Sequence, residues 1–309
     1  MVLQLYWVTM AGWEMWYTSL VLFATVTHKV SSNSFEMDLA PNAVDDAYSA
    51  CREQMLQKIL AKDGGILQTE LDNSSEFKSA WDGSKGCVKL ISGGQHEHTR
   101  ALQSFSNSRK LFKKVNGAVK TNGGNVDDYT NKFQFKSLHF LMMDAMRLLK
   151  NGTNCRTVYS STFDDINAVK GAEVRFGAFV SANADRSFTE EGCTDGGTLF
   201  NITTCSLINL ENRVCALDEV SMLISPVELF KVVDVKSKTD CNREIVLTSL
   251  GFKSDHDCYL FPRVATPTAH TTSATTDSSD IGSSTQWMSS RGVVLLTTLL
   301  SMCSIFLAL

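Results

Sequence analysis

The spacing of apolar residues changes from helical to strand-like halfway along this chain, and this change most constrains its fold. Apolar side chains recur every three or four residues from Val44 to Ile59 and from Phe135 to Leu149, which predicts helices with one buried face. Short β-branched and aromatic runs then alternate with Gly, Asn and Asp clusters, and they predict strands at residues 156–162, 174–181, 198–205, 227–235 and 244–250. Helices followed by strands predict an α+β domain with a helical N-terminal half packed on a strand-rich core.

The C-terminal end has the pattern of a lipid-attachment signal. Val293–Leu309 is an uncharged apolar stretch of seventeen residues, close to the minimum for a membrane-spanning helix, and nothing polar follows it. The small residues Gly282–Ser284 and a short spacer precede it. This arrangement predicts that residues 285–309 are removed and that a glycosylphosphatidylinositol (GPI) lipid is attached at Gly282. A tail-anchored helix is the alternative.

Other segments indicate the secretory pathway and the extracellular face of the plasma membrane. Residues 263–284 are rich in Ser and Thr and predict a solvated stalk. The apolar run Leu20–Val26 predicts a signal peptide over about residues 1–32, although Glu14 stands where a positive charge is usual. Asn73, Asn151 and Asn201 begin N-glycosylation sequons. The folded ectodomain is then expected over residues 36–262.

The cysteines favour disulfides over a metal site. Cys303 lies in the segment expected to be removed, which leaves eight of the nine cysteines, and no CxxC pair occurs. His96 and His98 lie in a polar stretch and are expected to be solvated, so no metal is predicted. A net charge of −4 without a basic cluster argues against nucleic acid as a partner.

Several motifs occur in a fixed order along the chain. They are Asp38–Tyr48 followed by Cys51, Phe133–Phe140, Val158-Tyr159, Arg175–Phe179 and Leu223–Phe230. In order and spacing they resemble the vertebrate arginine-specific mono-ADP-ribosyltransferase ectoenzymes, from about Asp38 to Cys258. The resemblance implies an ADP-ribosyltransferase-like fold, GPI anchoring, and disulfides joining Cys51 to Cys258 and Cys155 to Cys205. It leaves three possible pairings for the remaining cysteines, which are Cys87, Cys193, Cys215 and Cys241.

The resemblance also implies a reaction, the transfer of ADP-ribose from NAD to an arginine of an extracellular protein, with release of nicotinamide. Breaking this glycosidic bond places positive charge on the ribose, so the site must hold the diphosphate and present a carboxylate near the ribose. Members of the family use an arginine on the first core strand, a Ser-x-Ser motif on the next, and a Glu-x-Glu motif before a later strand.

This chain departs from two of those motifs. Ser160 stands in place of the arginine, and Arg156, four residues earlier on the same strand face, lies about 13 Å away. Ser-x-Ser becomes Ser181-Ala182-Asn183, and Ala178 replaces a common glutamine. The NAD-binding residues implied by position are Tyr159, Ser160 and Ser181, and Ser181 is also expected to be one of the catalytic residues.

The glutamate motif can be placed in two registers. Pairing Glu219-Val220 with the family's final Glu-Val makes Glu219 catalytic and puts Leu217 in the acceptor-binding position, with two extra residues before Leu223. Counting back from Leu223 without a gap makes Glu219 the first glutamate and puts Ser221 at the catalytic position. We take Glu219 as the catalytic residue, because a loop accepts insertions more readily than a strand.

Three functions follow as hypotheses. The first is an ecto-ADP-ribosyltransferase, whose activity the altered motifs would weaken. The second is a catalytically dead surface recognition protein with the same fold, and the third is a lipid-linked adhesion molecule with another fold.

Overall fold

The first half of the described chain is helical, as the apolar spacing predicts. The structure is a computed structural model that describes residues 34–150, 154–194, 196–217 and 220–261. Its helices in this half are α2 (Arg52–Leu60), α3 (Ile66–Asn73), α4 (Ser75–Gly83), α5 (His96–Ser106), α6 (Arg109–Thr121), the π-helical turn η1 (Asp128–Lys132) and α7 (Lys136–Leu149). The predicted signal peptide, stalk and lipid-attachment segment lie outside the described residues. Within the described residues, no helix combines the length and apolarity needed to span a membrane.

The second half builds three sheets, which confirms the α+β class. A five-stranded sheet has the order β2-β6-β10-β9-β4 and a three-stranded antiparallel sheet the order β5-β8-β7, while β1 pairs with β3. In the large sheet only β6 and β10 run parallel. The strands are β1 (Phe35–Glu36), β2 (Arg156–Thr162), β3 (Ile166–Asn167), β4 (Glu173–Val174), β5 (Val180–Ala182), β6 (Thr198–Thr204), β7 (Ile208–Asn209), β8 (Met222–Ile224), β9 (Glu228–Ser237) and β10 (Arg243–Phe252), and the short helices α8 (Arg186–Glu190) and η2 (Glu191–Cys193) separate β5 from β6.

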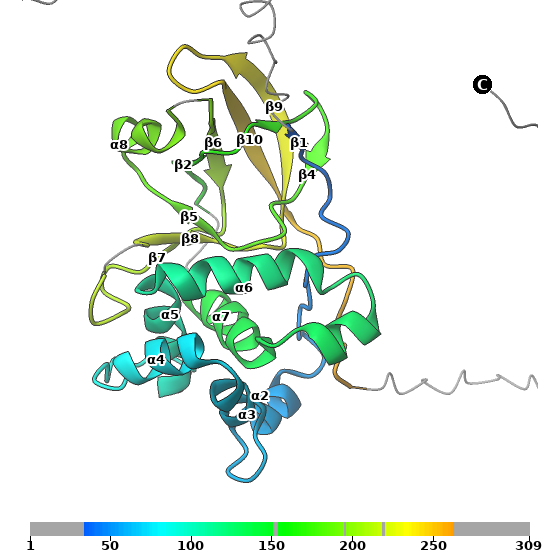
Figure 1. The fold of residues 1–309 in the computed structure, drawn as a ribbon, viewed down its shortest axis with the longest axis vertical. Helices are drawn as coiled ribbons and strands as arrows, with labels where there is room; N and C mark the ends of the chain where they lie inside the picture. The colour runs from blue at the N-terminus through cyan, green and yellow to red at the C-terminus, as the bar shows by residue number, and fades with distance from the viewer. Residues whose placement is uncertain (1–33, 151–153, 195, 218–219, 262–309) are drawn as a thin grey trace, which may run out of the picture. The chain divides into compact units, whose positions relative to one another are not determined.

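Two large apolar cores hold the described layers together. One lies among the helices and reaches Phe179 and Leu223 of the segments around the three-stranded sheet. The other lies among the strands and includes Val158, Phe230 and Ile245. Figure 1 shows helices α2 to α7 on one side and the large sheet on the other, with α6 running beside β5 and β8.

The predicted helical stripe from Val44 to Ile59 is helical only from Arg52 onward. Asp46 instead holds the preceding segment through its carboxylate, which accepts the backbone N–H groups of Tyr48, Cys258 and Tyr259 at 3.1, 2.7 and 3.0 Å. Tyr48 adopts a positive φ of 54°, which ends any helical path there. Contacts with residues about two hundred positions away thus override the local helical pattern.

The predicted strand at residues 174–181 is divided into β4 and β5. Between them the chain leaves the large sheet at Arg175 and joins the small sheet at Val180. Gly177 makes the crossing possible, because its φ is +59° and a Cβ there would lie 2.5 Å from the Cβ of Ala40. The other four predicted strands match β2, β6, β9 and β10 to within two residues at each end.

Four disulfides link distant parts of the chain. Cys51–Cys258 and Cys155–Cys205 are the pairs that the resemblance implies, with Cα separations of 5.8 and 4.0 Å. The four cysteines left open pair as Cys87–Cys215 and Cys193–Cys241. Cys51–Cys258 spans 207 residues, and closing so long a loop strongly reduces the conformational entropy of the unfolded chain.

A buried carboxylate caps the first turn of α7. Glu70 on α3 is 5% exposed and accepts the backbone N–H groups of Lys136 and Ser137 at 2.7 and 2.9 Å, together with the Ser137 hydroxyl. Burial raises the pKa of Glu70 from 4.5 to about 7, although these hydrogen bonds oppose the shift. The carboxyl group therefore changes its protonation near neutral pH.

Glu70→Gln is expected to change how stability depends on pH. Because the folded-state pKa lies above the unfolded one, the protonated form of Glu70 favours folding. This stabilisation is complete below about pH 4.5 and is lost as the pH rises through about 7. The loss in the free energy of unfolding is on the order of 3 kcal/mol. Urea denaturation of both proteins between pH 4.5 and 8 should show wild type losing stability relative to Glu70→Gln. Parallel stability curves would contradict this assignment.

Candidate active-site cleft

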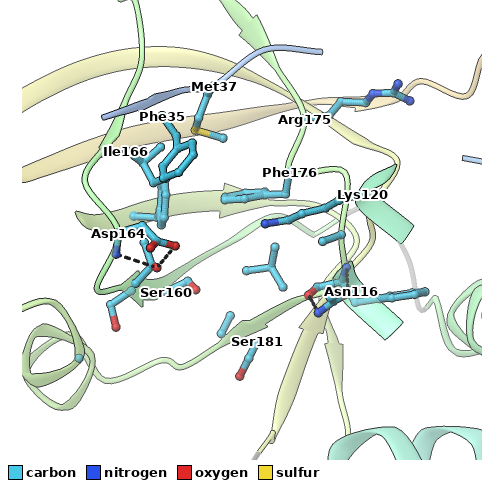
Figure 2. A pocket seen from close by; sticks show the side chains of 18 of the residues that line it. Phe35, Met37, Asn116, Lys120, Ser160, Asp164, Ile166, Arg175, Phe176 and Ser181 are labelled. Carbon is cyan, nitrogen blue, oxygen red and sulfur yellow. Dashed lines mark hydrogen bonds between the residues drawn. The ribbon is translucent and has the colours of Figure 1, made fainter. Parts of the chain in front are cut away.

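A cleft of about 1190 Å³ lies between α6, β1, β2, β5 and the segment through α8. Figure 2 shows side chains from several elements around it, with those of Ser160 and Lys120 directed toward its centre. Its volume and mixed lining of aromatic, hydroxyl and charged groups are typical of a site for a small organic ligand.

Backbone pairing brings three of the predicted site residues to this cleft. Tyr159 and Asn183 exchange two hydrogen bonds of 2.8 Å, so the strand bearing Ser160 adjoins the end of β5. Ser181 then pairs with Leu223 of β8, two residues after Ser221. Ser160, Ser181 and Ser221 are all half-buried and all line the cleft.

The remaining predicted residues fall in several places. Tyr159 and Ala178 line the cleft, whereas the described lining includes neither Arg156 nor Leu217. Glu219 lies outside the described residues, so its catalytic role stays a prediction. Its neighbour in the chain, Val220, is buried against the helical core.

Arg175, the one arginine in the described lining of the cleft, is bound by other groups of the protein. Arg175 has a side chain 1% exposed, and its guanidinium donates to Asp45 at 2.7 Å, to the carbonyls of Leu39 and Lys253 at 2.7 Å each, and to Asp255 at 3.3 Å. In Figure 2 its guanidinium points away from the cleft centre. Arg175 therefore cannot substitute for the arginine that Ser160 replaces.

Helix α6 forms the wall opposite β2, and Asn116 attaches it to the strand that carries Ser181. The Asn116 amide accepts the backbone N–H of Phe179 at 3.0 Å and donates to the carbonyl of Phe179 at 2.9 Å. Asn116 is almost fully buried, so these two bonds satisfy polar groups that water does not reach. They set the distance between α6 and β5.

The same face of α6 carries two lysines that the sequence analysis did not single out. Lys113 and Lys120 line the cleft, and each lies about one helical turn from Asn116 and Gly117. Positions 113, 116, 117 and 120 have the i, i+3, i+4, i+7 spacing of one helix face. That spacing is visible in the sequence, but a lysine at such a position is also typical of a solvated surface.

Two aromatic rings extend the apolar part of the lining. Phe35 and Phe188 line the cleft with 60% and 64% of their surfaces exposed. Exposed rings in a cleft can stack on a planar heterocycle, and base–aromatic stacking contributes roughly 1–3 kcal/mol per base.

The sequence analysis predicted that His98 is solvated, and this prediction is wrong. His98 is fully buried. Its Nε2 lies 2.9 Å from Asp144, and its Nδ1 accepts the backbone N–H of Gln95 at the start of α5. Burial would raise the pKa of Asp144, but hydrogen bonds from His98, Arg52 and Arg147 outweigh it and lower that pKa. Across the described part of the chain, no three His, Cys, Asp or Glu side chains are grouped to hold a metal.

The predicted glycosylation sites differ in accessibility. Asn73 is exposed at the end of α3, whereas Asn201 lies half-buried in β6. The Asn201 Nδ2, the atom that would carry a glycan, donates to Glu244 at 3.1 Å. Asn151 lies outside the described residues.

Comparisons with known proteins identify the family of this chain. A family model described as NAD:arginine ADP-ribosyltransferase matches residues 37–255. Ecto-ADP-ribosyltransferase 5 of Bos taurus is 30% identical over 73% of this chain and 72% of its own, and GPI-linked NAD(P)(+)--arginine ADP-ribosyltransferase 1 of Mus musculus is 28% identical over 74% of each. A crystal structure of a variant of the eukaryotic mono-ADP-ribosyltransferase ART2.2 in complex with NAD superimposes with a TM-score of 0.61 at 26% identity, covering 72% of this chain and 98% of the other. This chain belongs to the NAD:arginine ADP-ribosyltransferase family.

Proposed function

We propose that this protein binds NAD in the cleft and transfers its ADP-ribose to a guanidino group of an extracellular acceptor protein. The observation that carries the proposal is that Tyr159, Ser160 and Ser181 line one cleft, in a chain of this family. The exposed rings of Phe35 and Phe188 support it, because NAD offers two planar heterocycles for stacking.

The reaction breaks the bond between the ribose C1 and the nicotinamide nitrogen. Nicotinamide leaves as a neutral molecule, positive charge develops on the ribose, and a guanidine nitrogen of the acceptor attacks C1 and then loses a proton. A carboxylate beside the ribose stabilises this charge. We assign that carboxylate to Glu219, and we assign Ser160, Ser181 and Tyr159 to NAD binding.

A second candidate function is recognition at the cell surface without catalysis. The lining position of Ser221 favours it, because the ungapped register puts Ser221 where the family has its catalytic glutamate. In that case both family charges, the arginine at Ser160 and the glutamate at Ser221, are replaced by hydroxyls that carry no charge.

The proposal includes the placement of the protein at the cell surface. We propose a signal peptide over about residues 1–32, the folded region over 36–262, a stalk over 263–284, and attachment of a GPI lipid at Gly282, with release of the C-terminal segment that contains residues 285–309. Glycosylation is proposed at Asn73, since that side chain is exposed. The relatives named ecto- and GPI-linked support this placement.

One measurement distinguishes the two candidate functions. The full chain is produced in animal cells, and nicotinamide release from NAD is followed at the cell surface with and without a small guanidine acceptor. Release that increases with the acceptor supports the transferase. Binding of NAD without release, in both wild type and Ser160→Arg, supports the recognition protein. Absence of NAD binding would contradict the transferase.

A further inference from the structure

The cleft lacks the arginine that its family uses for the NAD diphosphate, and the structure offers a different source of positive charge. Figure 2 shows Lys120 reaching from α6 into the cleft, with its ammonium group directed toward the space bounded by Phe176 and Ser160. Lys113 lines the cleft two helical turns earlier, about 10 Å along the axis. Both lysines are exposed.

These two lysines are the cations of the described lining that remain available to a ligand. Neither has an ion pair or a side-chain hydrogen bond with another described residue, whereas Lys114 on the same helix pairs with Glu76 at 2.9 Å. The third cation of the lining, Arg175, is buried and bound to Asp45. Arg186, near the cleft, is held by Glu244 at 2.8 Å and by Glu190 at 3.0 Å.

The helix surface between the two lysines is open. Gly117 lies one turn from each of them in the middle of α6, where glycine costs stability of about 1 kcal/mol relative to alanine. A Cβ added at Gly117 would meet no atom within 4 Å, so nothing in the protein requires a glycine there. A group bound between Lys113 and Lys120 can therefore approach the helix backbone closely.

We propose that Lys120, assisted by Lys113, binds the diphosphate of NAD against the Gly117 surface of α6 and replaces the charge lost at Ser160. This inference rests on the proposed function, in which NAD occupies the cleft. The diphosphate carries two negative charges, and two ammonium groups on one helix face offset them. The positive charge that contacts the diphosphate would then lie on α6, whereas in the family it lies on the strand that corresponds to β2, on the opposite wall of the cleft.

The test is a calorimetric titration of the full chain with NAD, ADP-ribose and adenosine. Lys120→Gln should weaken binding of NAD and of ADP-ribose by about ten-fold or more, the usual loss for a charge-assisted contact to phosphate, and Lys113→Gln by a smaller factor. Adenosine lacks the diphosphate, so its affinity should not change. Lys120→Arg should retain most of the affinity, and the salt dependence of NAD binding should be smaller in Lys120→Gln than in wild type.

Matched variants separate this inference from the proposed function. Lys110→Gln removes a lysine of the same helix that does not line the cleft, and it should bind NAD as wild type does. Ser160→Arg should recover part of the affinity lost in Lys120→Gln. NAD binding that is unaffected by Lys120→Gln would overturn the inference and leave the proposed function standing. A wild type that binds neither NAD nor ADP-ribose would overturn both.

Discussion

Glu219→Gln is expected to lower the rate of nicotinamide release from NAD by at least about a hundred-fold. The substitution keeps the size of the side chain and removes the negative charge that would stabilise the ribose cation. Losing one preorganised electrostatic contact to a transition state commonly costs a hundred- to a thousand-fold in rate. The measurement is single-turnover nicotinamide release at saturating NAD, with NAD affinity determined in parallel to show that binding persists.

Ser221→Glu distinguishes the two registers of the glutamate motif. Ser221 lines the cleft and lies one residue before β8, so a carboxylate there would face the bound dinucleotide. If Glu219 is the catalytic residue, a carboxylate at position 221 is two residues away from the required position and should not restore activity to Glu219→Gln. Recovery of activity in the double variant, or an unchanged rate in Glu219→Gln alone, would contradict the assignment to Glu219.

Asp45→Ala is expected to destabilise the folded chain by about 3–5 kcal/mol. Asp45 is 2% exposed and accepts the Arg175 guanidinium at 2.7 Å, the backbone N–H of Asp255 at 2.9 Å and a hydrogen bond from His256. Its removal leaves the guanidinium buried without its main counter-charge, which is far more costly than losing an exposed ion pair. Urea denaturation at neutral pH gives the change in free energy of unfolding.

Asp255→Ala provides the matched control, because Asp255 also pairs with Arg175 but is 50% exposed. Its loss should cost about 1 kcal/mol or less. Combining Asp45→Leu with Arg175→Met should cost less than Asp45→Ala alone, since no unpaired charge then remains buried. Equal effects of Asp45→Ala and Asp255→Ala would contradict the view that burial makes this pair important.

Four strands of the large sheet, β2, β6, β9 and β10, could be predicted from the sequence because their signals are local. Residues 156–162 form β2 with the predicted bounds, because the run contains β-branched and aromatic residues that favour strands. The segment around Tyr48 could not be predicted in this way. Its conformation depends on Asp45 and Asp46 binding residues 255–259, and no local pattern reports contacts between the two ends of a domain.

The residues of the site could be predicted only in part from the sequence. The resemblance identified Ser160, Ser181 and Ser221, but spacing alone would not bring together residues that lie on three separate segments. The pairing of Cys87 with Cys215 also depends on the folded path, since four cysteines allow three arrangements. Lys120 was missed because an unpaired lysine on a helix has the same sequence signal whether it faces solvent or a cleft.

The most direct test is a crystal structure of the protein with NAD, prepared at a concentration where solution binding is saturated. We expect NAD to occupy the cleft between α6 and the strands β2 and β5, in contact with Ser160 and Ser181. NAD bound elsewhere on the protein, with this cleft empty, would contradict the proposal.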